Sequence, residues 1–132
     1  MNDERIPRYL IYDIIKFEGD DVGQTNFSTR LLCIDKEIIK TRAKHIQEGR
    51  IDKLREPFRL RQKQFWPIIE TKTLLGPKFT KASLGHEPDG LIFQPGDEPY
   101  KMGRDDNILK WKPSSHNSVD FKLRVVRENR PG

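Results

Sequence analysis

Two lysines in the second half of the chain, Lys110 and Lys112, lie two residues apart in the segment 108–112 (ILKWK). In a β-strand they point to one face, while Leu109 and Trp111 point to the other. Two close ammonium groups repel each other unless an anion lies between them. A phosphate oxygen about 4 Å from one ammonium gains roughly 4 kcal/mol at an effective dielectric constant of about 20. The spacing is typical of a phosphate-binding strand, and a solvated strand edge with ordinary lysines is the alternative.

A carboxylate and a glycine, Asp89 and Gly90, open the apolar segment 91–93. Glycine permits a close approach of the backbone to a neighbour. A carboxylate near phosphate-binding lysines usually accompanies a hard divalent cation such as Mg²⁺ or Mn²⁺. Asp-Gly is also a common dipeptide of tight turns, so a simple turn stays open as the alternative for this pair alone.

The spacing of apolar residues predicts the elements that hold these groups. Residues 9–17 (YLIYDIIKF) are aromatic and β-branched and predict a central strand. A helix should follow, capped by Thr25 or Asn26 and ending before Gly49. Its apolar face combines four residues at steps of four, three and four, which are Phe27, Leu31, Ile34 and Ile38.

Further strands and one helix follow along the chain. Strands are predicted at 58–65, 89–94, 108–112 and 119–126, and a helix at 67–75. The last strand alternates cleanly, with Val119, Phe121, Leu123 and Val125 on one face. Strands interleaved with two helices predict an α+β fold with a mostly antiparallel sheet.

Composition and charge limit the classes to which the protein can belong. The chain has 132 residues, which is the length of one ordinary domain, and a formal net charge of +5. This mild basic excess suits an anionic partner such as a nucleotide or RNA, although many small proteins are equally basic. The single cysteine excludes a disulfide framework and favours an intracellular protein. No apolar stretch is long enough to span a membrane, so no membrane partner is expected.

Four short motifs occur in order along the chain. They are YLIYD (9–13), DGLIF (89–93), LKWKP (109–113) and NSVDF (117–121). Together they resemble the later motifs of the mRNA capping guanylyltransferases, within the covalent nucleotidyltransferase superfamily that also includes ATP-dependent DNA ligases and RNA ligases. The resemblance covers nearly the whole chain and is closest to the metazoan capping enzymes.

This resemblance implies roles for three residues at a guanine base. Tyr12 matches the aromatic residue that stacks on the base, a contact typically worth about 1–3 kcal/mol. Ile92 matches the apolar residue on the other face of the guanine, and Lys63 matches a basic residue that contacts the base. Plain alternation puts Asp89 and Ile92 on opposite faces of a strand, so both can serve one pocket only if the strand is irregular near Gly90.

The resemblance also implies roles at the phosphates of GTP. Lys110 and Lys112 would hold the α-phosphate and neutralise charge that develops in the transition state. Asp89 would act through Mg²⁺ or Mn²⁺. Asp120 matches an acid of the family just after the lysine strand, where it could bind the metal or orient a lysine.

The chain departs from the family pattern at the nucleophile. The family reaction is attack of the lysine of a Lys-x-Asp-Gly motif on the α-phosphate of GTP, and the Asp-Gly present here follows Glu87-Pro88. The resemblance therefore implies that residues 1–127 are the C-terminal part of a guanylyltransferase nucleotide-binding domain. Residues 128–132 would begin the linker to an OB-fold that the sequence lacks. We expect this chain to be inactive alone.

Three functions are compatible with these residues. The first is part of an mRNA guanylyltransferase in the nucleus, with GTP and the 5′-diphosphate end of RNA as substrates and the phosphorylated tail of RNA polymerase II as a further partner. The second is part of an ATP-dependent polynucleotide ligase. The third is a non-catalytic module that binds RNA or the polymerase tail.

Overall fold

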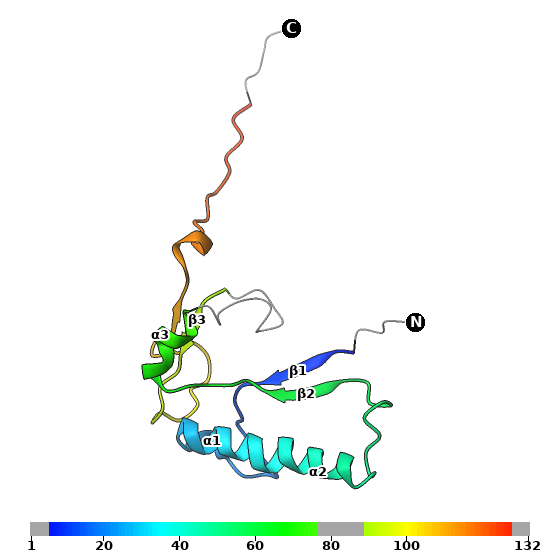
Figure 1. Ribbon diagram of the computed structural model, residues 1–132. Coiled ribbons are helices and arrows are strands. Elements are labelled where there is room, and N and C mark those ends of the chain that lie inside the picture. Colours follow the sequence, from blue (N-terminus) through cyan, green and yellow to red (C-terminus); the bar gives the residue numbers. More distant parts are fainter. Residues whose placement is uncertain (1–5, 77–88, 128–132) are drawn as a thin grey trace.

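The computed structural model describes residues 6–76 and 89–127. Its centre is a long helix beneath a two-stranded sheet (Figure 1). The helix spans residues 27–47 without a break and comprises α1 (Phe27–Cys33), a π-helical stretch η2 (Ile34–Lys40) and α2 (Thr41–Gln47). The predicted end before Gly49 is thus confirmed.

Asn26 is the residue that starts this helix. Its side-chain oxygen accepts a hydrogen bond from the Thr29 backbone N–H at 2.8 Å, as the sequence predicted for a capping residue. Phe27 and Ile34 from the predicted apolar face are buried, whereas Leu31 and Ile38 are only half-buried. The inner face of the helix thus contains fewer apolar side chains than the spacing predicted.

The sheet above the helix is parallel. Strand β1 (Arg8–Ile11) pairs with β2 (Arg59–Gln62), with Arg8 opposite Arg59 and Ile11 opposite Gln62. The side-chain amide of Gln62 donates to the Leu31 carbonyl oxygen at 3.0 Å, which attaches one face of the sheet to the helix. The opposite face of this sheet is not covered by the helix.

A second pair of strands lies beside this body. Strand β3 (Leu91–Phe93) pairs with β4 (Leu109–Trp111) in antiparallel fashion, with Ile92 opposite Lys110. Short helical turns complete the described elements: η1 (Val22–Gln24), η3 (Ile68–Glu70), α3 (Thr71–Leu74) and η4 (Ser114–His116). The predicted helix at 67–75 corresponds to η3 and α3.

Three predictions about the strands differ from the structure. The fold is α+β as expected, but its described strands form one parallel and one antiparallel pair rather than a mostly antiparallel sheet. The strand predicted at 9–17 ends at Ile11, because the Asp13 carboxylate accepts the Ile14 N–H at 2.8 Å and the chain then turns back on itself at residues 17–20.

The strand predicted at 119–126 does not form either. Residues 117–127 leave the body as an extended, exposed trace (Figure 1). Phe121 is 89% exposed, and no strand within the described residues pairs with this segment. An alternating pattern provides an apolar face, but ladder hydrogen bonds require a second strand.

Candidate functional site

The two lysines and the carboxylate that the sequence singled out come together at β3 and β4. The Lys110 Nζ donates to the Asp89 Oδ2 at 2.9 Å, and both side chains are substantially exposed. The pKa of Asp89 is lowered, first by this hydrogen bond and by the charge of Lys110, and further by the charge of Lys112. Both ammonium charges therefore act on one carboxylate, which stays ionised at neutral pH.

Gly90 creates the strand irregularity that this arrangement requires. Its φ of +143° lies in a region that residues with a side chain rarely adopt, and a Cβ there would overlap the Trp111 carbonyl oxygen. Regular strand geometry begins only at Leu91. Asp89 can therefore reach Lys110, the cross-strand neighbour of Ile92. The strand is thus irregular at Gly90, which is the condition under which Asp89 and Ile92 can serve one pocket, and both residues adjoin Lys110.

A second group of predicted residues lies at the end of β1. Tyr12 is 61% exposed and lines a shallow pocket of about 310 Å³ together with Leu10, Ile15 and Tyr100. The Lys63 backbone N–H donates to the Ile11 carbonyl oxygen at 2.7 Å, so Lys63 lies next to Tyr12 across the two strands. An exposed aromatic ring beside a lysine can bind a nucleobase by stacking and by a hydrogen bond.

The structure thus places the predicted residues in three locations. Tyr12 and Lys63 directly follow the two strands of the parallel sheet. The other group, Asp89, Ile92, Lys110 and Lys112, lies on or beside the antiparallel pair. The pocket beside Tyr12 is not lined by Asp89, Lys110 or Lys112. Asp120 belongs to the extended segment that leaves the body.

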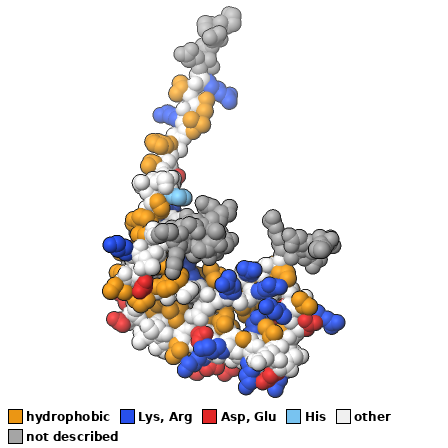
Figure 2. Space-filling model, viewed as in Figure 1, with side chains coloured by type: hydrophobic (Ala, Val, Ile, Leu, Met, Phe, Trp, Pro, Cys, Tyr) orange, Lys and Arg blue, Asp and Glu red, His pale blue; other side chains and the backbone are white. Residues whose placement is uncertain are grey.

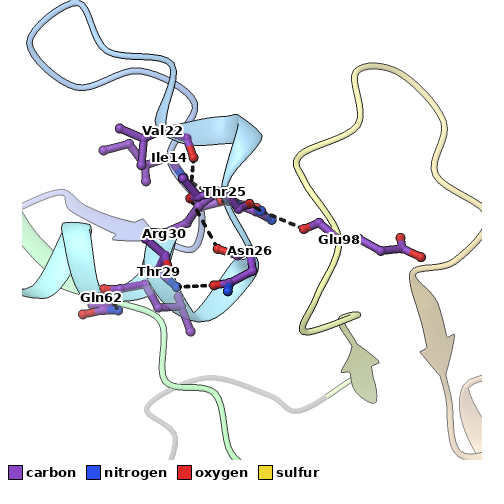
Figure 3. A network of polar contacts seen from close by, with 10 residues as sticks. Ile14, Val22, Thr25, Asn26, Thr29, Arg30, Gln62 and Glu98 are labelled. Atoms are coloured by element: carbon purple, nitrogen blue, oxygen red, sulfur yellow. Dashed lines mark hydrogen bonds and ion pairs between the residues drawn. The ribbon is translucent and has the colours of Figure 1, made fainter.

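Arg30 is a residue that the sequence analysis did not identify. Only 1% of it is exposed, and its guanidinium binds three separate segments (Figure 3). Nε and Nη2 donate to the Asp13 carboxylate at 2.7 and 3.2 Å. Nη1 donates to the carbonyl oxygens of Thr25 and Glu98 at 2.6 and 2.9 Å. This one side chain therefore connects the end of β1, the start of the helix and the segment between β3 and β4.

A sequence signal for this network exists in the helical spacing. Phe27, Arg30 and Ile34 are separated by three and four residues, so they share one face of the helix. A buried arginine requires a carboxylate and several carbonyl oxygens as partners, and Asp13 of the YLIYD motif is the carboxylate. The network fixes the residue that follows Tyr12 and holds the segment containing Tyr100.

Beside the β3–β4 pair, the carboxylate of Asp89 is a candidate ligand for a divalent cation. Within the described residues, no group of three or more His, Cys, Asp or Glu side chains could hold a metal ion. Mg²⁺ is commonly bound by one or two carboxylates together with phosphate oxygens of a substrate. Asp89, exposed beside two lysines, fits that kind of site, whereas the segment that contains Asp120 runs away from it.

Comparison with known proteins decides the family. Residues 1–114 match the sequence profile described as mRNA capping enzyme, catalytic domain. The chain belongs to the mRNA capping enzyme catalytic-domain family.

Individual capping enzymes agree with the profile. The chain is 55% identical over 127 residues to the mRNA-capping enzyme of Danio rerio and 53% identical over 127 residues to that of Mus musculus. In both cases the match covers 96% of this chain and 21% of the relative. The mRNA-capping enzyme subunit alpha of Saccharomyces cerevisiae is 34% identical over 124 residues, covering 88% of this chain and 25% of the relative. The chain thus spans about a fifth to a quarter of the length of these capping enzymes.

The described residues add one finding about membranes. None of their helices combines the length and the apolar character that a crossing of the bilayer requires.

Proposed function

We propose that the chain supplies the guanine-binding and phosphate-binding part of an mRNA guanylyltransferase, which transfers GMP from GTP through a lysyl-GMP intermediate to the 5′-diphosphate end of RNA. The observation that carries this proposal is the cluster of Lys110, Lys112 and Asp89 on the β3–β4 pair. Membership of the capping family favours this function over that of a polynucleotide ligase.

The phosphate contacts follow from the charges of the cluster. Lys110 and Lys112 present two ammonium groups beside an exposed carboxylate, so the α-phosphate of GTP can take the place of Asp89 as the partner of Lys110. A Mg²⁺ or Mn²⁺ ion held by Asp89 and by phosphate oxygens would neutralise further phosphate charge. Asp120 would join this group only if the segment 117–127 folded back.

The guanine contacts follow from the parallel sheet. Tyr12 provides an exposed ring for stacking and Lys63 a neighbouring ammonium for the base. Ile92, 45% exposed on β3, would cover the other face of the base. Because Tyr12 follows β1 and Ile92 lies on β3, a base held by both residues would bridge the two strand pairs.

The nucleophile is the component that this sequence lacks. A free lysine has a pKa near 10.4, so only about one molecule in 2,500 is neutral at pH 7. Neighbouring cations lower such a pKa, and Lys110 and Lys112 suit that role. We therefore propose that the chain alone forms no lysyl-GMP. Phosphorylated polymerase tail as a partner and the nucleus as the location belong to the same proposal.

Nucleotide binding tests the proposal directly. Calorimetric titration of the full chain with GTP and with ATP, in the presence of Mg²⁺, should show a preference for GTP. Tyr12→Ala should weaken GTP binding by about 1–3 kcal/mol, roughly 5- to 150-fold, and Lys110→Ala should weaken it as well. Lys101→Ala removes an exposed lysine from the segment between the strands of the β3–β4 pair and serves as the matched control.

Labelling tests the catalytic part of the proposal. Incubation of the chain with GTP labelled at the α-phosphate should leave no label on the protein after denaturation. Covalent labelling of this chain would show that one of its own side chains is the nucleophile, which contradicts the proposed division of roles. Equal affinity for GTP in the Lys110→Ala and Lys101→Ala variants would contradict the phosphate site.

A further inference from the structure

The face of the β1–β2 sheet that points away from the helix carries a row of arginines beyond the proposed guanine site. In the parallel register Arg8 lies opposite Arg59, and Leu10 lies opposite Arg61. Gln62 on the other face binds the helix, so alternation directs Arg59 and Arg61 away from the helix. Figure 2 shows Lys and Arg side chains gathered over this half of the molecule. We call Arg8, Arg59 and Arg61 the arginine strip.

Among the residues that the structure describes, no carboxylate forms an ion pair with an arginine of the strip. Within residues 6–76 and 89–127, ion pairs are formed by Arg30, Arg42, Arg50, Arg55 and Arg104 but by none of the three strip arginines. The Nε of Arg59 is buried and has no hydrogen-bond partner among the described residues. Like charges directly opposite each other in a sheet are destabilising. An anion bound between Arg8 and Arg59 would relieve this repulsion.

The strip is linear and leads to an aromatic pocket. Arg59, Arg61 and Lys63 are each two residues apart, which places neighbouring cations about 6.6 Å from one another along an extended strand. This spacing is similar to that of successive phosphates in an extended single strand of nucleic acid. At its end lies the pocket formed by Tyr12, Leu10 and Tyr100. A track of cations beside exposed aromatic rings is the usual surface for single-stranded nucleic acid.

We propose that the arginine strip binds the phosphates of single-stranded RNA, the strand whose 5′ end is to be capped. The inference rests on the proposed function only for the identity of that RNA. A phosphorylated peptide has fewer and less regular anions than a polynucleotide backbone, and it has no bases to stack on Tyr12. The strip therefore favours RNA over a phosphopeptide.

Salt dependence provides the test. Binding of a fluorescein-labelled 12-nucleotide single-stranded RNA with a 5′-diphosphate is measured by anisotropy for the full chain between 50 and 200 mM salt. For a single strand, the slope of log K against log salt changes by about 0.7 for each phosphate contact. The triple variant R8Q/R59Q/R61Q should therefore bind more weakly, with a slope that is lower by about 2.

A matched control separates the strip from net charge. The triple variant R50Q/R55Q/R104Q removes three exposed arginines that are each paired with an acid, and both triple variants have a formal net charge of +2 instead of +5. The slope for the control should differ from the wild-type slope by no more than about 0.7, the change expected for one phosphate contact. Circular dichroism checks that both variants fold. If R59Q unfolds the chain, R8Q/R61Q replaces the triple variant, with an expected drop of about 1.4 in the slope.

The outcomes distinguish this inference from the proposed function. Absence of RNA binding, equal slopes in the strip and control variants, or strip-dependent binding of a phosphoserine peptide but not of RNA would each overturn the inference. Loss of GTP preference with strip-dependent RNA binding intact would overturn the proposed function alone. Normal GTP binding by the strip variant, together with a reduced salt slope, supports both.

Discussion

The Arg30 network and the Asp89–Lys110 pair both join a cation to a carboxylate, but in opposite surroundings. The side chains of Arg30 and Asp13 are 1% and 9% exposed, and every nitrogen of the guanidinium has a partner. The side chains of Lys110 and Asp89 are 45% and 70% exposed and share a single hydrogen bond. The first pair can hold three segments together, whereas the second can exchange its partner for a phosphate. Burial thus separates a structural ion pair from a binding site.

Removal of Arg30 should have the largest effect. Arg30→Ala leaves the Asp13 carboxylate buried without its cation, and such losses typically cost about 3–5 kcal/mol. We expect urea denaturation followed by circular dichroism to show a chain that is largely unfolded in buffer. Arg104→Ala breaks an exposed pair with Asp106 and should cost no more than about 1 kcal/mol. Similar midpoints for the two variants would show that the buried network does not stabilise the fold.

A side chain at Gly90 should have the next largest effect. Gly90→Ala forces a positive φ on alanine and places its Cβ against the Trp111 carbonyl oxygen, which should cost about 1–3 kcal/mol. Amide exchange at β3 and β4 should accelerate, while exchange in the helix should stay slow. Gly96→Ala, where a Cβ meets open space, is the control and should change little. Unchanged protection of β3 in Gly90→Ala would mean that the close approach is dispensable.

Loss of the helix cap should have a smaller effect. Asn26→Ala removes the acceptor for the Thr29 N–H and should lower the free energy of unfolding by about 1 kcal/mol. Ser28→Ala replaces an exposed residue in the first turn of the same helix and should leave the free energy of unfolding nearly unchanged. Urea midpoints measured for the two variants check this difference. Equal midpoints would exclude a capping contribution from Asn26.

The exposed pair should affect titration more than stability. Because the pKa of Asp89 is lowered, the Lys110 contact stabilises the fold above the ordinary aspartate pKa and loses this effect as the pH falls through the lowered value. Lys110→Met should raise the Asp89 pKa toward its ordinary value, and Lys112→Met should raise it less. Carboxyl chemical shifts followed by NMR during acid titration measure both. A larger rise with Lys112→Met would reverse the assignment of the main partner.

Local patterns predicted the helix well. The helix has its own cap and period, so its start at Asn26 and its end before Gly49 depend on nearby residues alone. The four-motif resemblance predicted the family, which the comparisons confirm. The positive φ of Gly90 meets the condition that the sequence set for Asp89 and Ile92 to serve one site, and the roles of these two residues stay predictions.

Predictions that depend on distant partners were less accurate. The parallel pairing of β1 with β2 cannot be deduced from either strand, since direction depends on how the connecting helix returns the chain. The segment 119–126 alternates like a strand, but within the described residues it has no neighbour to pair with. Arg30 has the helical spacing of a core position. Because charged residues are seldom buried, its spacing alone did not predict this role.

The parallel register of β1 and β2 also has a consequence for the folding kinetics. Arg8 and Arg59 are separated by about fifty residues along the chain, so their pairing closes a long loop, whereas the helix between them forms from local contacts. Chains whose contacts are far apart in sequence fold more slowly than chains with local contacts. We therefore expect helical signal to develop before the sheet during refolding. The sheet face that carries the arginine strip would then be among the last surfaces to assemble.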